Sequence, residues 1–518
     1  MKNRIFVAIA VVALALVCVA GVAEEKIFIY ARPVSKTIDP APACADEEVQ
    51  NCLLVYDTLV RLDEDLNIQP SLAESWEISE DGREYIFHLR RGVKFHDGTP
   101  FTAEAVKYSF DRLVGVGMQC MGTYSSMVGD NSPTVIDDYT VKITLASPNP
   151  WLVNDELIIP AAYGIVNPSY VQAHATADDP WAETWMANNA NGTGPFKLEE
   201  WIPGERMVFV KNSEYWDKDR IPEVDKLIFR IFKESATARL WLERGEVDAA
   251  EKLTPDDFEA LRAVPDVETR SVPYPLMIML MMDVSRPPFN DLLVRKAMAY
   301  AINYDEIMEK AERGNAIRST SAAEPPGMLG YTGNPLPYRY APEVAKYLLS
   351  LSSYPEGFSF DLNYALVRRA TFEEIALYLQ AYLEEIGLQA NLVNLSLAAR
   401  NELQKKGGYG VTLMQNSVSR PSSDSSMGWL YDHRRGIGSG WTATFWDDPW
   451  PMDNLKQARE TFDVDVRRDL YVNTDRVVSE LLIYVPLYQA QKLIAVRKEV
   501  KNLPYTAFYF GLFWDAEK

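Results

Sequence analysis

The C-terminal half of the sequence alternates strand and helix patterns, and this alternation constrains the fold more than any other feature. Short apolar runs of strand length lie at residues 358–364, 388–395 and 411–414, and amphipathic segments separate them. Thr371 and Glu374 form a capping-box pattern at the start of the first of these helices. Strands joined through helices run parallel, because parallel neighbours need a crossover connection. This part of the chain is therefore predicted to be an α/β lobe on a parallel sheet.

A second alternation of the same kind lies nearer the middle of the chain. A strand pattern at 227–232 is followed by a helix pattern at 236–244, a short strand at 247–249 and a helix that Thr254 is expected to cap. The chain has 518 residues, which exceeds the size of one ordinary hydrophobic core. We therefore expect at least two lobes of the α/β class, each with an apolar interior of its own.

The N-terminus has the pattern of a secretory signal peptide. Lys2 and Arg4 precede an apolar run at 5–20, and small residues follow that run. Cys18 lies within the run, but the residues before it do not match a lipobox, so simple secretion or an uncleaved anchor is favoured over a lipid anchor. Residues 1–23 are therefore predicted to be a signal peptide or an N-terminal anchor. The rest of the chain is expected in the periplasm or at the outer face of the cytoplasmic membrane.

The net charge narrows the classes of partner. The formal charge is -21, from 73 acidic and 52 basic side chains, and the acidic residues are spread along the chain without a tail-like block. A surface of this sign repels nucleic acid, which argues against nucleic acid as a partner. The charge is most simply a solubility feature of an exported protein.

Three cysteines remain after the signal segment, and their number is odd: Cys44, Cys52 and Cys120. In an oxidising compartment they could form one disulfide and leave one free thiol. Three buried thiols would fit the same count. Both alternatives stay open at the level of the sequence.

A β-hairpin is predicted at residues 192–216, whose sequence is GTGPFKLEEWIPGERMVFVKNSEYW. Two glycines and Pro195 make the first turn, Pro203 and Gly204 make the second, and the residues between and after them alternate as strands do. The GTGPF turn and the N-x-x-Y-W end resemble the signature of the extracytoplasmic solute-binding proteins of ABC importers, in the peptide/nickel-binding class. Three further blocks are similar to the same family, at residues 72–112, 289–307 and 340–358.

The resemblance implies a two-lobed periplasmic-binding-protein-like fold of type II, in the large cluster with an extra accessory subdomain. It predicts lobe I at residues 24–275 and 487–518, the accessory subdomain at about 56–180, and lobe II at 276–486. A protein of this family captures a polar solute between its lobes and delivers it to the membrane subunits of an ABC transporter. The expected ligand is a peptide, an oligosaccharide or a similar solute. No cofactor is expected, and the expected state is a monomer.

Ligands of open α/β sheets bind beyond the carboxyl ends of the strands, so the segment after Met414 is expected to face the cleft. We expect a loop at 415–432, followed by a stretch rich in aromatic residues whose flat rings suit ligand capture. The alternative is that these aromatic residues cover the lobe's own core. The candidate ligand-binding residues in these two stretches are Gln415, Asn416, Ser419, Arg420, Trp429, Tyr431, Trp441 and Trp446.

The same segment departs from the pattern of the peptide-binding relatives. Those relatives carry a Trp and then an Asp after this strand, the Asp pairing with the α-amine of the ligand, and residues 415–421 contain neither. The departure leaves a sugar, a peptide without a free amine or another polar solute open. Arg420 could pair with a ligand carboxylate as a planar fork, or lie on the surface.

The resemblance adds two candidate residues at the walls of the cleft. Asp46 ends the loop at 39–46, and Tyr274 lies between Pro273 and Pro275. An interlobe hinge at Tyr274 and a plain surface turn would both fit this Pro-Tyr-Pro sequence.

Sequence features of an enzyme are scarce. The four histidines lack the i, i+4 spacing of a helical metal site, and no metal site is predicted. His433 is the one histidine placed to meet a metal-chelate ligand. We find no G-x-S-x-G elbow and no Walker loop. The predicted function is therefore a receptor rather than an enzyme. A secreted hydrolase acting on polysaccharide or peptide, and an adhesive surface protein, are the alternatives.

Overall fold

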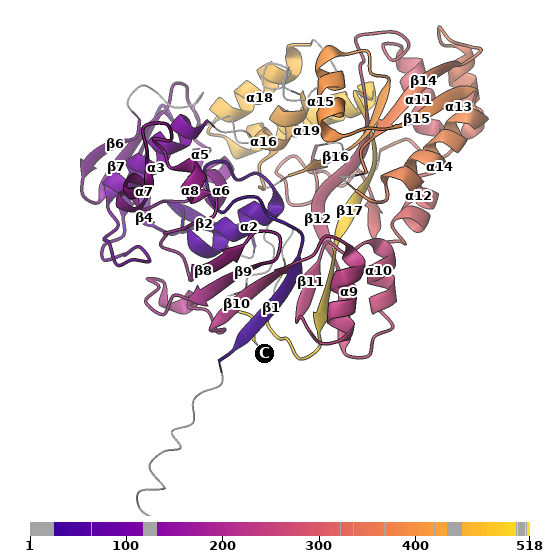
Figure 1. The fold of residues 1–518 in the computed structure, drawn as a ribbon. Coiled ribbons are helices and arrows are strands. Elements are labelled where there is room, and N and C mark those ends of the chain that lie inside the picture. The colour runs from indigo at the N-terminus through magenta and orange to yellow at the C-terminus, as the bar shows by residue number, and fades with distance from the viewer. Residues whose placement is uncertain are drawn as a thin grey trace, which may run out of the picture.

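The computed structural model describes residues 25–63, 65–117, 132–321, 323–334, 336–366, 369–418, 420–431, 448–503, 505, 513 and 515–517. Within these residues one sheet of 11 strands runs through the molecule (Figure 1), in the order β15-β14-β16-β12-β17-β11-β1-β10-β9-β8, with β13 paired to β17. Smaller sheets are formed by β2 and β3 and by β4, β5, β7 and β6. None of the helices in the described ranges is long and apolar enough to cross a membrane.

The first half of the large sheet is built around β1, which runs parallel to both β10 and β11. The predicted hairpin is present here as the antiparallel pair β8 and β9, and β9 continues onto β10. Two helices lie beside β11 at the lower edge of this half (Figure 1). The elements are β1 (Ile27–Arg32), β8 (Phe196–Ile202), β9 (Arg206–Lys211), β10 (Lys226–Ile231), β11 (Ala249–Glu251), α9 (Ser235–Glu243) and α10 (Pro255–Leu261).

A group of short elements inserted between β1 and β8 covers one side of this half-sheet (Figure 1). It contains α2 (Asp46–Val55), β2 (Val60–Leu62), β3 (Ile68–Pro70), β4 (Ala73–Ile78), β5 (Glu84–Leu89), α3 (Ala103–Val116), β6 (Thr134–Asp137), β7 (Thr140–Thr144), α5 (Leu152–Asp155), α6 (Pro160–Tyr163), α7 (Pro168–His174) and α8 (Glu183–Met186). A 3₁₀ turn, η1 (Lys218–Arg220), follows β9.

The second half of the sheet confirms the predicted alternation of strand and helix. Strand β14 is parallel to both β15 and β16. The elements are α11 (Leu292–Ala301), α12 (Tyr304–Ala311), β13 (Ala316–Arg318), α13 (Pro342–Ser350), β14 (Phe358–Tyr364), α14 (Phe372–Glu385), β15 (Leu388–Asn394), α15 (Leu397–Lys406), β16 (Val411–Ser417), α16 (Ser423–Tyr431), α18 (Trp450–Glu460) and α19 (Val464–Leu481).

The predicted capping box at the start of α14 is wrong. Thr371 makes no side-chain bond to the first turn of the helix. Its hydroxyl lies 3.1 Å from a carboxylate oxygen of the buried Glu312 and donates to it. A hydrogen bond to a charged carboxylate is stronger than one between neutral groups. The Thr371 side chain therefore bonds Glu312 instead of capping the helix.

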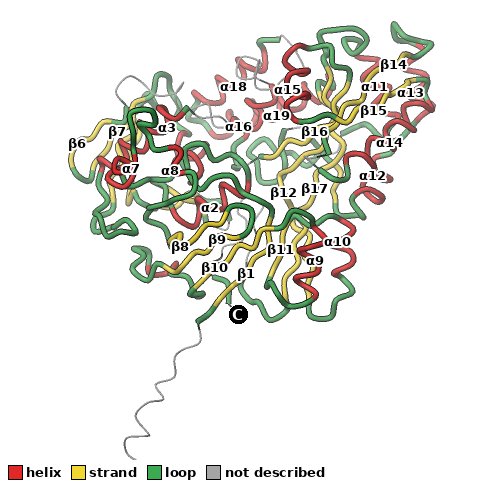
Figure 2. Tube along the Cα trace, in the orientation of Figure 1, coloured by secondary structure: helices red, strands yellow, loops and turns green. Residues whose placement is uncertain are grey.

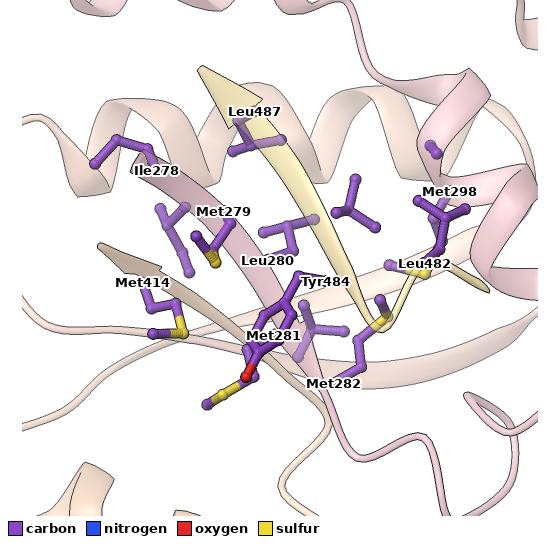
Figure 3. Close-up of a cluster of buried hydrophobic side chains, with 14 of the residues drawn as sticks. Ile278, Met279, Leu280, Met281, Met282, Met298, Met414, Leu482, Tyr484 and Leu487 are labelled. Carbon is purple, nitrogen blue, oxygen red and sulfur yellow. The ribbon is translucent and has the colours of Figure 1, made fainter. Parts of the chain in front are cut away.

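Two long antiparallel strands, β12 (Val267–Met282) and β17 (Tyr484–Arg497), connect the halves of the sheet (Figure 2). The apolar run at the end of β12 is buried on both faces, as expected for a central strand. Figure 3 shows Ile278, Met279, Leu280, Met281 and Met282 of this run among side chains of β16 and β17.

The buried apolar side chains form separate cores on the two sides of this connection. We call the clusters built on β1, α2 and the inserted elements the N-terminal core, and the cluster around the end of β12 the C-terminal core. Along β12, Val272 packs against the N-terminal core, whereas Tyr274 belongs to the C-terminal core. Along β17, the change lies between Ala490 and Leu493. The backbone passes from one core to the other in the middle of both strands.

Candidate functional site

The turn that opens the signature hairpin packs directly against the C-terminal end of α2. A Cβ atom at Gly192 would lie 2.0 Å from the carbonyl oxygen of Val55, and one at Gly194 would lie 2.6 Å from the Val55 carbonyl carbon. The Gly194 N–H donates to that same oxygen at 2.9 Å. Only glycine allows this approach, so the two glycines fix α2 against the sheet.

The remaining signature residues converge on one buried carboxylate, Asp57. Thr193 Oγ1 and Trp216 Nε1 both donate to its Oδ2 at 2.8 Å, and the Tyr215 hydroxyl donates to Oδ1 at 2.8 Å. Asn212 Nδ2 donates to the carbonyl of Gly194 at 3.0 Å. The conspicuous polar and aromatic residues of the signature are therefore structural, and they hold the chain that leaves α2.

His96 also belongs to this structural cluster. Its Nε2 donates to the carbonyl of Gly194 at 3.0 Å, and its Nδ1 accepts from the N–H of Gly192 at 3.4 Å. Burial of the ring lowers the pKa of His96 to about 4, although the Gly194 bond opposes the shift. The imidazole is therefore neutral at physiological pH.

We expect His96 to make the protein less stable as the pH falls from about 6.5 to about 4. In the unfolded state the imidazole binds a proton near pH 6.5, and in the folded state only near pH 4. The contribution of His96 to the free energy of unfolding is therefore complete above pH 6.5 and is lost as the pH falls to about 4. Burial raises the pKa of Asp475 to about 6, which acts in the opposite direction over the same pH range. The measurement is therefore the difference in unfolding free energy between wild type and His96→Gln. A difference that does not change between pH 7 and pH 4.5 would contradict the assignment.

A buried ion pair fixes the start of the loop that leads into α2, at Asp39. Both guanidinium nitrogens Nη1 and Nη2 of Arg112, on α3, donate to Asp39 at 2.6 Å. At the other end of the loop, Glu48 accepts from the N–H groups of Cys44 and Ala45 at 2.7 and 2.9 Å. The first turn of α2, which carries Asp46, is thus rigidly placed.

Tyr274 joins this turn to the C-terminal half of the protein. Its hydroxyl donates to Asp46 and lies 3.4 Å from the hydroxyl of Ser417, the last residue of β16. Gln489 on β17 donates to the carbonyl of Tyr274 at 2.8 Å. Tyr274 is buried within β12, so the alternative of a plain surface turn is wrong. Residues from α2 and β16 therefore meet at the Tyr274 hydroxyl on β12, and a residue of β17 binds the Tyr274 backbone.

Lys252 balances the negative charge of Asp46 beside the Tyr274 hydroxyl. Its Nζ lies 3.1 Å from Asp46 and 2.6 Å from Glu47, both on α2. Burial alone would raise the pKa of Asp46, but Lys252 and the Tyr274 hydroxyl outweigh it, so that pKa is lowered. Asp46 is therefore an anion whose charge is already balanced by the protein.

Two buried ion pairs connect α5 and the residue after it to the C-terminal half, and we call them the bridging ion pairs. Arg420 Nη2 donates to Glu156 Oε1 at 3.0 Å, with the side chains 1% and 2% exposed. Arg467 Nη2 donates to Asp155, with the side chains 4% and 5% exposed. Burial raises the pKa of both carboxyl groups despite the guanidinium partners. Leaving either group of such a pair without its partner would be costly.

A tryptophan strengthens the same contact. Trp151 Nε1 donates to the carbonyl of Thr461 at 2.7 Å. The guanidinium carbon of Arg467 lies 4.5 Å from the centre of the Trp151 ring, within the range of a cation–π interaction. The N-terminal and C-terminal cores are therefore closed against each other along this edge.

A cavity of about 280 Å³ lies beside the bridging ion pairs. Its walls come from the β2–β3 connection and α5 on one side and from α19 and the loop before α16 on the other. Leu62, Ile68, Trp151, Pro421, Arg467 and Tyr471 are among the residues that line it. The cavity is thus shared between the two halves of the protein.

The expected loop at 415–432 is largely wrong. Gln415 and Asn416 are the two residues before the end of β16 at Ser417, and they lie opposite Ile278 and Met277 of β12. Trp429 and Tyr431 lie in α16, where Trp429 is half-buried and Tyr431 is packed in the C-terminal core. A helix forms because its polar first turn is buried against partners elsewhere in the chain.

Arg420 is neither on the surface nor in a loop that faces solvent, because it is buried in the pair with Glu156. The other candidates of the sequence analysis, namely Ser419, Trp441, Trp446 and His433, lie outside the described residues. Reasoning from the sequence missed Lys252, Ser417, Gln489, Asp155, Glu156 and Arg467. Only Ser417 carried a usable signal, because it follows Met414 on the same strand.

The cysteines follow the pattern of one disulfide and one free thiol. Cys44 is disulfide-bonded, and Cys52 is a free thiol buried on α2. Cys120 lies outside the described residues. Among the side chains that the structure describes, no group of three or more His, Cys, Asp or Glu residues is placed to hold a metal ion.

Comparison with known proteins gives one consistent result. Residues 67–438 match the profile of the bacterial extracellular solute-binding proteins, family 5 Middle. The chain is 29% identical over 497 residues to the probable D,D-dipeptide-binding periplasmic protein DdpA of Escherichia coli, covering 94% of this chain and 92% of that protein. It is 26% identical over 510 residues to the glutathione-binding protein GsiB of Shigella flexneri, covering 96% of each.

A solved structure of a periplasmic binding protein has a similar fold. The ABC transporter-associated periplasmic binding protein DppA of Helicobacter pylori, in complex with the peptide STSA, has a TM-score of 0.81 and 26% identity. The match covers 95% of this chain and 98% of that chain.

Proposed function

The chain belongs to family 5 of the bacterial extracellular solute-binding proteins, and from this premise we propose that it captures a short peptide or a peptide-like solute. Family membership, first indicated by the signature hairpin, is confirmed, and with it the role of a solute receptor for an ABC importer. The relatives are binding proteins rather than enzymes, so the hydrolase alternative has no support. Two of the relatives are named for D,D-dipeptides and for glutathione, and we extend that peptide chemistry to this chain.

The observation that carries the proposal is the meeting of three elements, α2, β12 and β16, at the Tyr274 hydroxyl. Asp46 contributes an anion from α2, and Ser417 contributes an exposed hydroxyl at the carboxyl end of β16. Gln415, half-buried on the same strand two positions earlier, has its side chain on the same face as Ser417 because side chains alternate along a strand. A peptide backbone carries donors and acceptors that match a hydroxyl, an amide and a carboxylate. We assign Asp46, Tyr274, Gln415, Asn416 and Trp429 to the walls around the ligand, with Ser419, Trp441 and Trp446 as further candidates. Arg420 and Tyr431 are not assigned there, because both are buried in contacts within the protein.

We propose for the receptor the domain boundaries that the family resemblance predicts. Lobe I would comprise residues 24–275 and 487–518, with the accessory subdomain at about 56–180, and lobe II residues 276–486. The change of core near Tyr274 on β12 and near Ala490 on β17 supports this division. The protein would act as a monomer outside the cytoplasmic membrane, with residues 1–23 as a signal peptide or anchor and without a nucleic-acid partner.

Native mass spectrometry of the gently purified protein tests the proposal first. A non-covalent peptide that is released unchanged on denaturation is the expected result. Titration calorimetry with D-Ala-D-Ala, L-Ala-L-Ala, glutathione and maltotriose then compares the solute classes. Binding of maltotriose without any peptide, or hydrolysis of a bound peptide, would contradict the proposal.

Removing the Tyr274 hydroxyl is expected to weaken binding of the identified ligand by about 10-fold or more. Tyr274→Phe would remove the hydroxyl that links Asp46 to Ser417 and leave Lys252 as the remaining donor to Asp46, and a lost bond to a charged group costs about 1.5–3 kcal/mol. Tyr340→Phe is the matched control, because Tyr340 is exposed and bonds only Glu385 among the described residues. Equal affinities of the two variants would remove Tyr274 from the binding site.

A further inference from the structure

The charges beside the Tyr274 hydroxyl are shared between α2 and Lys252. Two carboxylates of α2, Asp46 and Glu47, lie 3.1 and 2.6 Å from the one ammonium group of Lys252. Partial burial acts to lower the pKa of Lys252, but the two carboxylates outweigh it and raise that pKa well above its ordinary value. Lys252 is therefore a cation, and the three side chains together carry one net negative charge.

A second group of buried charges lies at the carboxyl ends of two neighbouring parallel strands (Figure 1). Arg32 ends β1 and is fully buried, and Glu251 ends β11. Glu251 forms an ion pair with Lys492 on β17, with the side chains 2% and 4% exposed. Burial acts to raise the pKa of Glu251, but Lys492 and Arg32 outweigh it, so that pKa is lowered. These three side chains together carry one net positive charge.

The two groups of charges cancel. Burial acts to raise the pKa of Asp46, and Lys492 joins Lys252 in lowering it, so the two groups act on each other. The carboxylates are Asp46, Glu47 and Glu251, and the cations are Lys252, Lys492 and Arg32. The bridging ion pairs are neutral in the same way, because each joins one carboxylate to one guanidinium group.

The proposed wall residues other than Asp46 are uncharged. They are Tyr274, Gln415, Asn416 and Trp429, with the exposed hydroxyl of Ser417 beside them. A charged end of a peptide would find no unbalanced counter-ion among the described groups of this wall, and moving an ion out of water is unfavourable unless a partner compensates it. Amide N–H and C=O groups need only neutral partners, such as hydroxyl and amide groups. The wall therefore favours amides over ionised ends.

We propose that this wall selects a peptide-like solute whose two ends are uncharged, such as an N-acylated peptide amide or a cyclic dipeptide. The inference rests on the proposed function and deepens it, because it names the charge class of the ligand. It agrees with the end of β16, where residues 415–421 lack the Asp that pairs with the α-amine in the peptide-binding relatives.

Calorimetric titration of the purified protein with four forms of Ala-Ala-Ala tests the proposal. The forms are the free tripeptide, its N-acetyl derivative, its C-terminal amide and the N-acetyl amide, so each end is charged or blocked independently. At about pH 7 the N-acetyl amide is expected to bind at least about 10-fold more tightly than the free tripeptide, because it has no ionised end to remove from water. The two singly blocked forms should lie between them.

Lys252→Met would convert the balanced wall into an anionic one. It removes the cation shared by the two carboxylates of α2, so the preference should shift by about 10-fold or more toward the C-terminal amide, which carries the α-ammonium group. Lys346→Met is the matched control, because Lys346 on α13 also lies near two carboxylates, those of Glu343 and Glu385. A variant that only disturbed the structure would weaken binding of all four forms alike.

The outcomes separate the charge class from the function on which it rests. Equal affinities for the four forms, tighter binding of a form with a charged end, or the wild-type order of affinities in Lys252→Met would overturn the neutral class and leave the peptide receptor standing. Binding of none of the four forms would overturn both. Tightest binding of the N-acetyl amide, with a preference that shifts toward the ammonium form in Lys252→Met and not in Lys346→Met, is the result that supports the proposal.

Discussion

Replacing Arg420 with methionine is expected to weaken ligand binding by about 100- to 4,000-fold. The variant leaves Glu156 buried without its cation whenever the two halves are closed, and breaking a buried ion pair in this way costs about 3–5 kcal/mol. When the halves separate, Glu156 regains water and the penalty disappears. The change therefore acts on closure, and through closure on affinity, since each 1.4 kcal/mol corresponds to a tenfold change.

The measurement is the dissociation constant of the identified ligand for the wild type and for Arg420→Met. The double variant Arg420→Met with Glu156→Gln should recover much of the affinity, because it removes both charges from the interface. Arg476→Met is the matched control, since it removes an exposed ion pair with Glu480 on α19. An affinity for Arg420→Met within threefold of the wild type would show that the pair does not govern closure.

The second large effect concerns stability rather than binding. Asp57→Ala is expected to lower the free energy of unfolding by at least about 3 kcal/mol. It leaves the donors of Thr193, Tyr215 and Trp216 without their acceptor, and each unpaired buried donor costs about 1–3 kcal/mol. The free energy of unfolding of Asp57→Asn should lie between those of Asp57→Ala and the wild type, because the amide keeps only one of the two acceptor oxygens.

Urea denaturation followed by circular dichroism measures the effect of Asp57. Asp178→Ala is the matched control, because Asp178 is exposed and no loss of stability is expected there. Binding of the ligand to the folded fraction of Asp57→Ala should remain near wild type, since the carboxylate bonds only the structural signature. A loss below about 1 kcal/mol would mean that the signature cluster is not what fixes the end of α2.

The regular α/β part of the fold was readable from the sequence because its signals are local. The strand predicted at 358–364 has the same bounds as β14, and Gly387 ends the segment that became α14 as expected. Apolar periodicity and turn residues are sufficient here, because each element buries one continuous face. The hairpin at 192–216 was predictable for the same reason.

The candidate site was harder to predict, because its parts have no local signal. The sequence of α16, SDSSMGWLY, is a poor helix former, and the helix is held by Asp424 bonded to Arg459 and by Ser423 bonded to Glu324. Glu156 lies 264 positions from Arg420, and Asp155 lies 312 positions from Arg467. No spacing rule connects residues at such distances. Only the resemblance directed attention to Asp46 and Tyr274.

The passage of β12 and β17 between the two cores has a mechanical consequence. Within the described chain these two adjacent strands carry the sheet across, and their register shifts between Pro273 and Leu276, where the ladder is interrupted. Two paired strands resist stretching and shearing, but they twist and bend easily at such an interruption. We therefore expect bending to be concentrated near Tyr274, with the N-terminal and C-terminal cores moving as two stiff bodies. A ligand that acts on either body would then produce a rotation at the residue whose hydroxyl lies against both Asp46 and Ser417.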